Sequence, residues 1–483
     1  MADKSIEKNS LYSLIKSISS VIFPLITFPY ISRILQPENI GKYNFSSSIV
    51  SYFSMFASLG VTTYAVRECA KFRNDKNILE KCSSEIISIN FFTSVISYIT
   101  LIITMFLVPS LQNYMYLIFI QSISIIFTTM GADWINTAME DFKYITIRTL
   151  GFQIISIILM FICVRNPNDY IKYAIIISIS ANGGNLCNIF YRKKYCRIHL
   201  TFKLNLRKHL KPILALFAMI VAQQIFTVSD TTMIGFFYGD YEVGLYSTAI
   251  RTYNVVNQVV ASVTWVVMPQ LSLYFSKKRY EEGKKVLNYA YSFILTIGLP
   301  VVIVIFFLSR EVIMIVGGTS YIEASASMKI LAITLGLAFI ACYLLNINIL
   351  ASGQDKVGLA ACIIPALFNL ITNYIFIPSF GIEAAAWTTV ASQIIIIAIC
   401  IPFLPKGFES IKIVLRNWNP YIAGIVLTAL CYFVTKNISN ISLRLFLCIG
   451  VGGGIYIGIL LFTKYKFLMD LLKDTKTKLF HQY

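Results

Sequence analysis

The sequence predicts an all-α integral membrane protein of about fourteen transmembrane helices, arranged as two pseudo-symmetric six-helix lobes followed by two C-terminal helices. Three observations lead to this fold class. The 483 residues are 57% hydrophobic and 13% charged, with a mean hydropathy of +0.70. Apolar stretches of about 20 residues, the length that crosses a bilayer, recur along the whole chain. The segments between them alternate between basic and nearly uncharged.

This composition excludes an ordinary soluble protein, because a single core of this chain length could not bury so much apolar surface. The bilayer must therefore act as solvent for much of the chain. The net charge of +18 could indicate nucleic-acid binding. However, the basic residues lie in short loops beside apolar stretches, where the positive-inside rule expects them. We therefore predict membrane lipids of the anionic inner leaflet as partners, and no nucleic acid.

The apolar stretches divide the chain into fourteen predicted spans. At 1.5 Å per residue each is long enough to cross the hydrocarbon core of a bilayer. The predicted spans are approximately 11–35, 41–66, 83–108, 113–134, 145–164, 168–190, 212–237, 243–274, 287–309, 325–352, 357–378, 380–403, 417–435 and 441–463.

The loop charges predict the orientation in the membrane. Lys and Arg gather in five segments, which are Arg67–Lys81, Arg192–Lys211, Lys277–Lys285, Lys406–Arg416 and Lys464–Lys478. The intervening links Pro109–Tyr114, Gly239–Gly244 and Pro378–Gly381 contain neither residue. Loops rich in Lys and Arg stay in the cytoplasm. With an even number of spans, both termini are therefore predicted to be cytoplasmic.

The short loops also limit the function. A membrane enzyme that works outside the bilayer needs an extramembrane surface for its acid and base groups, and no long loop provides one. The sequence contains no G-x-x-x-x-G-K-[ST] motif, which argues against a pump driven by ATP. The ten cysteines form no C-x-x-C pair and no disulfide framework. We predict a transporter with no catalytic residue, no metal site and no cofactor.

A faint internal repeat predicts the domain organisation. Ile40–Tyr43 (IGKY) and Val243–Tyr246 (VGLY) lie 203 residues apart, and each follows a short acidic link after a span. An offset of six helices preserves orientation, so the repeat is parallel. We predict an N-lobe over 1–200, a cytoplasmic linker over 201–211, a C-lobe over 212–405, and two further spans with a basic tail over 406–483.

Charged and amide side chains inside spans are the candidate binding residues, because such groups are costly in a bilayer unless they face a cavity or a partner. Arg251, Asn254 and Gln258 share one helix face in the eighth span. Asp230 lies at a similar depth in the seventh. Two interpretations remain open: a buried Asp230–Arg251 ion pair that fixes two helices, or a hydrated cavity in which Arg251 receives an anion and Asp230 orients it.

Other polar residues lie nearer the predicted membrane surfaces. Lys16 and Arg33, both in the first span, either face the cavity or extend to the interface by snorkelling. Glu85 and Asp133 are expected at the interface, and His209 lies in a cytoplasmic basic segment. Near the first lobe and in the eighth span, intramembrane basic residues outnumber carboxylates, which favours an anionic substrate. A glycine stripe at Gly450, Gly454 and Gly458 predicts close helix packing.

Several motifs resemble one known family. They are Pro24–Tyr43 (PLITFPYISRILQPENIGKY), Leu59–Glu68 (LGVTTYAVRE), Ala132–Trp134 (ADW) followed by Glu140–Lys143 (EDFK), and Val243–Tyr246 (VGLY) with Pro269–Ser272 (PQLS). With these motifs the chain resembles, over its full length, the Wzx-type polysaccharide flippases of the multidrug/oligosaccharidyl-lipid/polysaccharide exporter superfamily. The family usually has glycines near Gln36 and Asn39, which this sequence lacks.

The resemblance implies a substrate and a site. The substrate would be an oligosaccharide repeat unit on undecaprenyl diphosphate, moved from the cytoplasmic to the periplasmic leaflet of the bacterial inner membrane for O-antigen-like surface polysaccharide. Two lobes would enclose a central cationic cavity in which Arg251 and Lys16 meet the diphosphate, with Arg67 at the cytoplasmic entrance. Arg67 is equally explained as an ordinary positive-inside residue. A polysaccharide polymerase and glycosyltransferases would be further partners.

Two other functions remain open from the sequence. A cation-coupled drug antiporter of the same superfamily would need carboxylates inside its first lobe. A membrane scaffold for polysaccharide enzymes would need none of the buried charges for its activity.

Overall fold

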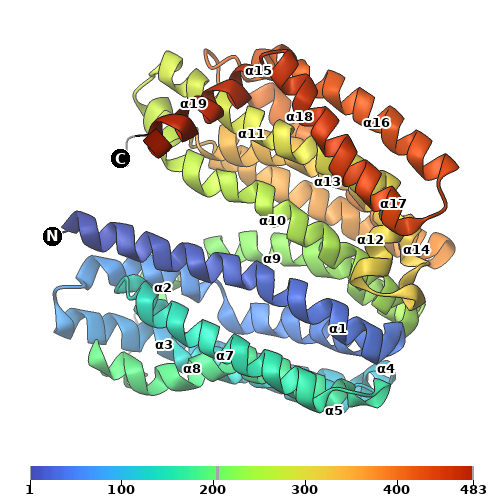
Figure 1. Ribbon diagram of the computed structural model, residues 1–483. Helices are drawn as coiled ribbons and strands as arrows, with labels where there is room; N and C mark the ends of the chain where they lie inside the picture. The colour runs from blue at the N-terminus through green and yellow to red at the C-terminus, as the bar shows by residue number, and fades with distance from the viewer. Residues whose placement is uncertain (1, 203–205, 481–483) are drawn as a thin grey trace. The chain divides into compact units, whose positions relative to one another are not determined.

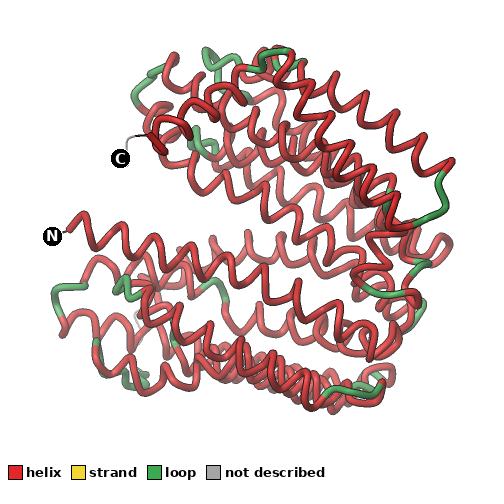
Figure 2. The backbone as a smooth tube through the Cα atoms, viewed as in Figure 1, coloured by secondary structure: helices red, strands yellow, loops and turns green. Residues whose placement is uncertain are grey.

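The computed structural model describes residues 2–202 and 206–480, and it is helical almost throughout, with no strand in these ranges. Figure 2 shows helices joined by short loops. The order in Figure 1 is α1 (Ala2–Ser58), α2 (Val61–Cys69), α3 (Lys76–Leu107), α4 (Pro109–Gln112), α5 (Met115–Gly131), α6 (Trp134–Ala138), α7 (Phe142–Cys163), α8 (Tyr170–Tyr191), α9 (Leu206–Phe237), α10 (Asp240–Ser276), α11 (Tyr280–Phe307), α12 (Ser309–Val316), α13 (Ala324–Cys342), α14 (Asp355–Cys400), α15 (Ser410–Arg416), α16 (Asn419–Asn437), α17 (Ile441–Leu445), α18 (Gly452–Phe462) and α19 (Lys466–Phe480). Short 3₁₀ and π segments extend several of these helices.

The membrane-crossing capacity of these helices confirms a multi-pass, all-α membrane protein. Within the described ranges, nine helices are long and apolar enough to cross a bilayer, and the bent pair α15–α16 gives a tenth. With 57 and 46 residues, α1 and α14 exceed what one crossing needs. Each contains one non-helical residue, Gln36 (φ 62°) and Gly381 (φ 64°), at the point where two spans were predicted to meet. The total of fourteen crossings stays a prediction.

The end of the second predicted span, 41–66, differs from the structure. The helix α1 stops at Ser58, because Leu59 (φ 45°) and Gly60 (φ 75°) adopt left-handed conformations that no helix continues through. The remaining residues begin the separate short helix α2. Hydrophobicity alone could not locate this break, since Leu59 is a good helix former.

The chain divides into two compact units, one ending at Ser247 and the other beginning at Thr248, within α10. In the first unit, α1 packs against α3, α5, α7 and α9, while α5 packs against α8. In the second, α13 packs against α11 and α14, and α16 packs against α11 and α18. The lobe limits at 200 and 212 stay a prediction.

The two halves of the sequence repeat meet inside the first unit. A Cβ atom added to Gly41 would lie 1.7 Å from the carbonyl oxygen of Asp240, and one added to Gly244 would lie 1.9 Å from that of Pro37. Each glycine therefore lets its helix contact the turn that precedes the other helix. Because only glycine allows such an approach, the repeated Gly-x-Tyr motif has a packing cause. Tyr114 adds a hydrogen bond from its hydroxyl to Asp240 Oδ1 (2.7 Å).

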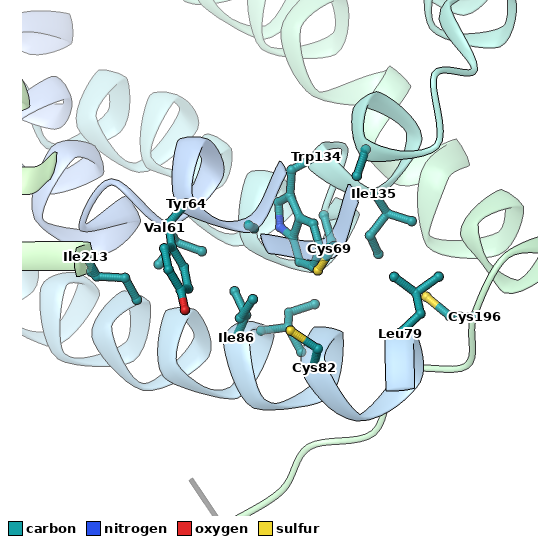
Figure 3. Packing of buried hydrophobic residues seen from close by; sticks show 14 residues of the cluster. Val61, Tyr64, Cys69, Leu79, Cys82, Ile86, Trp134, Ile135, Cys196 and Ile213 are labelled. Atoms are coloured by element: carbon teal, nitrogen blue, oxygen red, sulfur yellow. The ribbon is translucent and has the colours of Figure 1, made fainter. Parts of the chain in front are cut away.

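A core cluster joins α2, α3, α6 and α9 at the end of the first unit that is predicted to be cytoplasmic. Figure 3 shows Tyr64, Trp134 and Ile213 packed with residues of α3 around this cluster. His209, fully buried, pairs through Nδ1 with the Tyr64 hydroxyl (2.7 Å) and through Nε2 with Glu85 Oε2 (2.9 Å). Glu85 is only 8% exposed, so its carboxylate is buried within the protein; its predicted depth at the membrane interface stays a prediction. The histidine satisfies a carboxylate that would otherwise be costly to bury.

The basic segment before α9 is fixed to α3 by its backbone. The amides of Arg197, His199 and Thr201 donate to side-chain oxygens of Glu80 (2.8 Å), Ser84 (3.1 Å) and Ser88 (2.9 Å), respectively. The donors are two residues apart in an extended segment, a rise of about 6.6 Å, and the acceptors are four residues apart on a helix, a rise of about 6 Å. These similar rises let successive donors face successive acceptors. Of the predicted linker 201–211, residues from Leu206 onward form the start of α9, and 203–205 lie outside the described residues.

The C-terminal helices belong to the second unit. A cluster containing Leu308, Leu427 and Leu460 packs α16 and α18 against the end of α11. Arg444 forms an ion pair with the buried Glu311 (2.7 Å) that ties α17 to α12. The predicted glycine stripe is not a packing surface within the described chain: Gly454 and Gly458 have no atom within 4 Å of an added Cβ. Gly452 is the tightly packed glycine, with the added Cβ 2.7 Å from Leu427.

Substituting Gly41 or Gly244 with alanine tests the reciprocal contact. The added methyl group overlaps a backbone carbonyl, which cannot rotate away, so the helices must separate at a cost of about 1–3 kcal/mol or more. We expect Gly41→Ala and Gly244→Ala to lower the thermal unfolding midpoint of the detergent-purified protein. Gly454→Ala, a helical position with open space around it, is the matched control and should leave the midpoint unchanged or raise it slightly. Equal midpoints for all three variants would contradict the contact.

Candidate functional site

A cavity of about 490 Å³ lies inside the first unit. Its walls come from the part of α1 that follows Gln36, together with α5, α8 and α9. The lining residues are Tyr43, Ser47, Val50, Ser51, Ser54, Met55, Ser58, Gln121, Ser124, Thr128, Ala174, Ile177, Ser178, Ala181, Asn182, Ile220 and Gln224. Its volume falls within the range of small-molecule sites.

Hydroxyl groups dominate one wall of this cavity. Ser47, Ser51, Ser54 and Ser58 follow one another at spacings of four, three and four residues, which places them on one face of α1. Ser51 and Ser58 donate to carbonyl oxygens three residues earlier in the helix, at 2.7 and 3.0 Å. A hydroxyl that donates in this way keeps its lone pairs as acceptors. The stripe therefore offers acceptors to a ligand at the cavity wall.

Side-chain amides supply the rest of the polar lining. Gln121 donates through Nε2 to the Tyr43 carbonyl oxygen (3.1 Å), and Asn182 donates through Nδ2 to that of Ser178 (3.0 Å). The amide oxygens of Gln121 and Asn182 accept no hydrogen bond from the described residues. Both oxygens are buried, and buried acceptors without partners are costly.

The lining contains no Asp, Glu, Lys, Arg or His, as far as the described residues show. Apolar patches from residues such as Val50, Met55 and Ile177 alternate with the hydroxyls and amides. Such a mixture suits a neutral polyhydroxylated molecule, whose faces carry C–H groups and whose edges carry O–H groups. It offers neither a counter-ion for a charged substrate nor a titratable carboxylate.

The predicted site residues of the first unit lie outside this lining. Lys16 is half-buried on α1, and Arg67 is exposed in the last turn of α2. Arg33 is exposed and donates through Nη1 to the Pro29 carbonyl oxygen one turn earlier (2.5 Å). Asp230 is 5% exposed and accepts a hydrogen bond from the Tyr246 hydroxyl (2.5 Å). Their role in substrate binding stays a prediction.

The remaining candidates lie in the second unit, on α10. Arg251 is half-buried, whereas Asn254 and Gln258 are exposed on the same helix face. Asp230 and Arg251 belong to different units, so the predicted pairing between them also stays a prediction.

Two features of the first unit were missed from the sequence. The serine stripe repeats every three or four residues from Ser47 to Ser58, and this helical period of hydroxyls is the sequence signal that indicates it. Arg148 was not recognised as a buried cation. Its guanidinium pairs with Asp133 (2.9 Å), its side chain is 7% exposed, and it lies over the Tyr144 ring.

Comparisons with known proteins agree with this architecture. A family model described as "Polysaccharide biosynthesis protein" matches residues 6–275, and a second, MatE, matches residues 215–375. A putative O-antigen transporter of Escherichia coli (strain K12) is 25% identical over 272 residues, which span 56% of this chain and 65% of that relative's length. A putative O-antigen transporter of Shigella dysenteriae is 23% identical, covering 83% of this chain and 100% of that protein.

The fold agrees with a solved transporter structure. A structure of the lipid II flippase MurJ in an inward closed conformation aligns with a TM-score of 0.73 at 21% identity, covering 96% of this chain and 99% of that one. At this identity the likeness shows the fold alone. Together with the matched motifs, the family model and these relatives named as transporters confirm the predicted resemblance to Wzx-type flippases. The family model described as "Polysaccharide biosynthesis protein" matches more than half of the sequence, so the chain belongs to this family.

Proposed function

We propose that the protein is a flippase for lipid-linked oligosaccharides, moving repeat units on undecaprenyl diphosphate from the cytoplasmic to the periplasmic leaflet of a bacterial inner membrane. Both termini face the cytoplasm in this proposal, and the product enters the synthesis of an O-antigen-like surface polysaccharide. The relatives named as O-antigen transporters support this class of cargo. A polymerase and glycosyltransferases are its proposed partners.

The observation that carries the proposal is the uncharged cavity of the first unit. Sugars do not cross hydrocarbon unaided, because each unpaired hydroxyl costs several kcal/mol. The serine stripe together with Gln121 and Asn182 replaces water as the hydrogen-bonding surroundings of a glycan. The lipid tail remains in the bilayer while the glycan crosses by alternating access.

The diphosphate needs a different environment from the glycan. A guanidinium can hold a phosphate by charge-assisted hydrogen bonds, and Arg251, with Lys16, is our proposed contact. Asp230 is proposed to orient Arg251, and Asn254 and Gln258 to offer hydrogen bonds from the same helix face as Arg251, with Arg33 and Arg67 as further candidates nearer the membrane faces. In this division the sugars and the charge of the substrate are recognised by separate groups.

A cation-coupled drug antiporter is the alternative, since the MatE model also matches part of the chain. Such an antiporter would bind its cation at carboxylates inside the first lobe. Among the described residues, none of those that line the cavity of the first unit is acidic, which favours the flippase.

A cavity-filling substitution tests the glycan site. In proteoliposomes that contain a polyprenyl-diphosphate oligosaccharide, the wild-type chain should accelerate flipping, measured as glycan accessible to an external lectin. Ser54→Leu places a bulky apolar side chain in the cavity and should slow flipping by about tenfold or more. Thr100→Leu, on the exposed face of α3, should flip at the wild-type rate. Extrusion of a cationic dye by the wild type, without glycan flipping, would establish the antiporter.

Replacing Arg251 tests the diphosphate contact. Arg251→Ala should impair surface polysaccharide while the protein remains in the membrane, and Arg251→Lys should retain part of the function because it keeps the charge. Arg310→Ala removes an exposed arginine of the second unit and serves as the control. Full polysaccharide in cells that carry Arg251→Ala would reject this contact and would be the result expected of a scaffold.

The membrane potential should contribute to the driving force. Outward movement of an anion is favoured by an inside-negative potential by about 2.3 kcal/mol per charge per 100 mV. Dissipating the potential in proteoliposomes with K⁺ and valinomycin, at a fixed pH gradient, should therefore slow flipping. An unchanged rate would mean that the charge of the diphosphate does not cross the field.

A further inference from the structure

A second hollow in the first unit differs in chemistry from the glycan cavity. It is an apolar groove of about 250 Å³ between α3 and α5. We call it the α3–α5 groove, and its lining residues are Phe91, Ser94, Val95, Tyr98, Ile99, Ile126, Thr129 and Met130. From Phe91 to Ile99 it runs about 12 Å along α3, at 1.5 Å per residue.

The groove is open to the surroundings of the unit and has almost no polar surface. Val95, Ile99 and Met130 are 40%, 52% and 44% exposed. Two hydroxyls at its floor, those of Ser94 and Thr129, hydrogen-bond to each other at 2.6 Å. They therefore present little hydrogen-bonding capacity to an occupant. An extended hydrocarbon chain complements such a surface.

One end of the groove carries a positive charge. Arg192, which follows α8, donates through Nη1 to the carbonyl oxygen of Met130, the last groove residue on α5. Arg192 makes no ion pair with any carboxylate in the described ranges. Lys193 and Lys194 follow it, both exposed. The segment whose backbone amides bond to α3 (Arg197–Thr201) leads to Phe202, which packs against Phe92 of α3 with ring centroids 5.8 Å apart.

The apolar groove with a cation at one end matches a phospholipid, which has apolar acyl chains and a phosphate at one end. The end with Arg192 belongs to the side that loop charge predicts to be cytoplasmic, where anionic lipids are concentrated. We propose that the α3–α5 groove binds one acyl chain of an anionic phospholipid, with the lipid phosphate held by Arg192. Guanidinium and phosphate form charge-assisted hydrogen bonds. A zwitterionic lipid should bind more weakly, because its ammonium group is repelled by Lys193 and Lys194.

This site is independent of the glycan cavity. The cavity uses Gln121, Ser124 and Thr128 of α5, whereas the groove uses Ile126, Thr129 and Met130. At 100° per residue these sets lie on opposite faces of the helix. A bound lipid would thus support the wall of the cavity from behind without entering it. The proposal holds whether or not the flippase assignment is correct.

Lipid titration followed by native mass spectrometry of the full chain tests the site. We expect the wild type to retain one phosphatidylglycerol with higher affinity than phosphatidylethanolamine of identical acyl chains. Arg192→Gln should weaken phosphatidylglycerol binding about tenfold, the loss of one charge-assisted contact. Val95→Trp, which fills the groove at an exposed position, should weaken binding of both lipids. Arg416→Gln, which removes an exposed arginine of the second unit, should bind as the wild type does.

The opposite results are equally clear. Unchanged phosphatidylglycerol binding in Arg192→Gln would reject the phosphate contact, and unchanged binding in Val95→Trp would reject the groove as the place of the chain. One-for-one displacement of phosphatidylglycerol by low concentrations of a polyprenyl phosphate would assign the groove to the carrier lipid and overturn the proposal. Thermal unfolding of each variant without lipid, at the wild-type midpoint, shows that the fold is retained in these comparisons.

Discussion

The first unit depends on the reciprocal contact of two backbones. The turn at Pro37 lies against Gly244, and the turn at Asp240 lies against Gly41. No side chain intervenes, so the spacing of these helices is set by main-chain van der Waals radii and cannot adjust. This contact holds the backbone of α1 around Pro37 and Gly41 against the first residues of α10. A motif that looks like weak sequence similarity thus has a structural cause in the packing of two backbones.

The molecule separates chemical tasks by location. Neutral hydrogen-bonding groups line the cavity of the first unit, whereas the Glu85 and Asp133 carboxylates elsewhere in that unit are paired with His209 and Arg148. Paired charges hold helices together without creating a field that would bind ions indiscriminately. Arg192, which makes no ion pair within the described ranges, lies at one end of the α3–α5 groove. A substrate that is both sugar-rich and anionic requires this kind of separation.

The sequence predicted the large-scale architecture because hydrophobic length and loop charge are strong, local signals. It also placed the turns at Gln36 and Gly381 between paired spans. It failed where the outcome depends on contacts between distant segments. Nothing local in the sequence indicates that Glu85 is buried beside His209, because this pair joins residues 124 positions apart. The cavity could not be predicted for a related reason: serine hydroxyls cost little to bury, so their positions in a span carry a weaker signal than a charge does.

The hydrogen bonds from the backbone of the basic segment to α3 affect how this protein can change over evolutionary time. Its donors are the main-chain amides of Arg197, His199 and Thr201, which every residue except proline also possesses. The side chains of the segment can therefore gain or lose positive charge while the segment keeps its position. At exposed positions such as Arg197, mutation can therefore change the charge of this loop while its backbone hydrogen bonds remain.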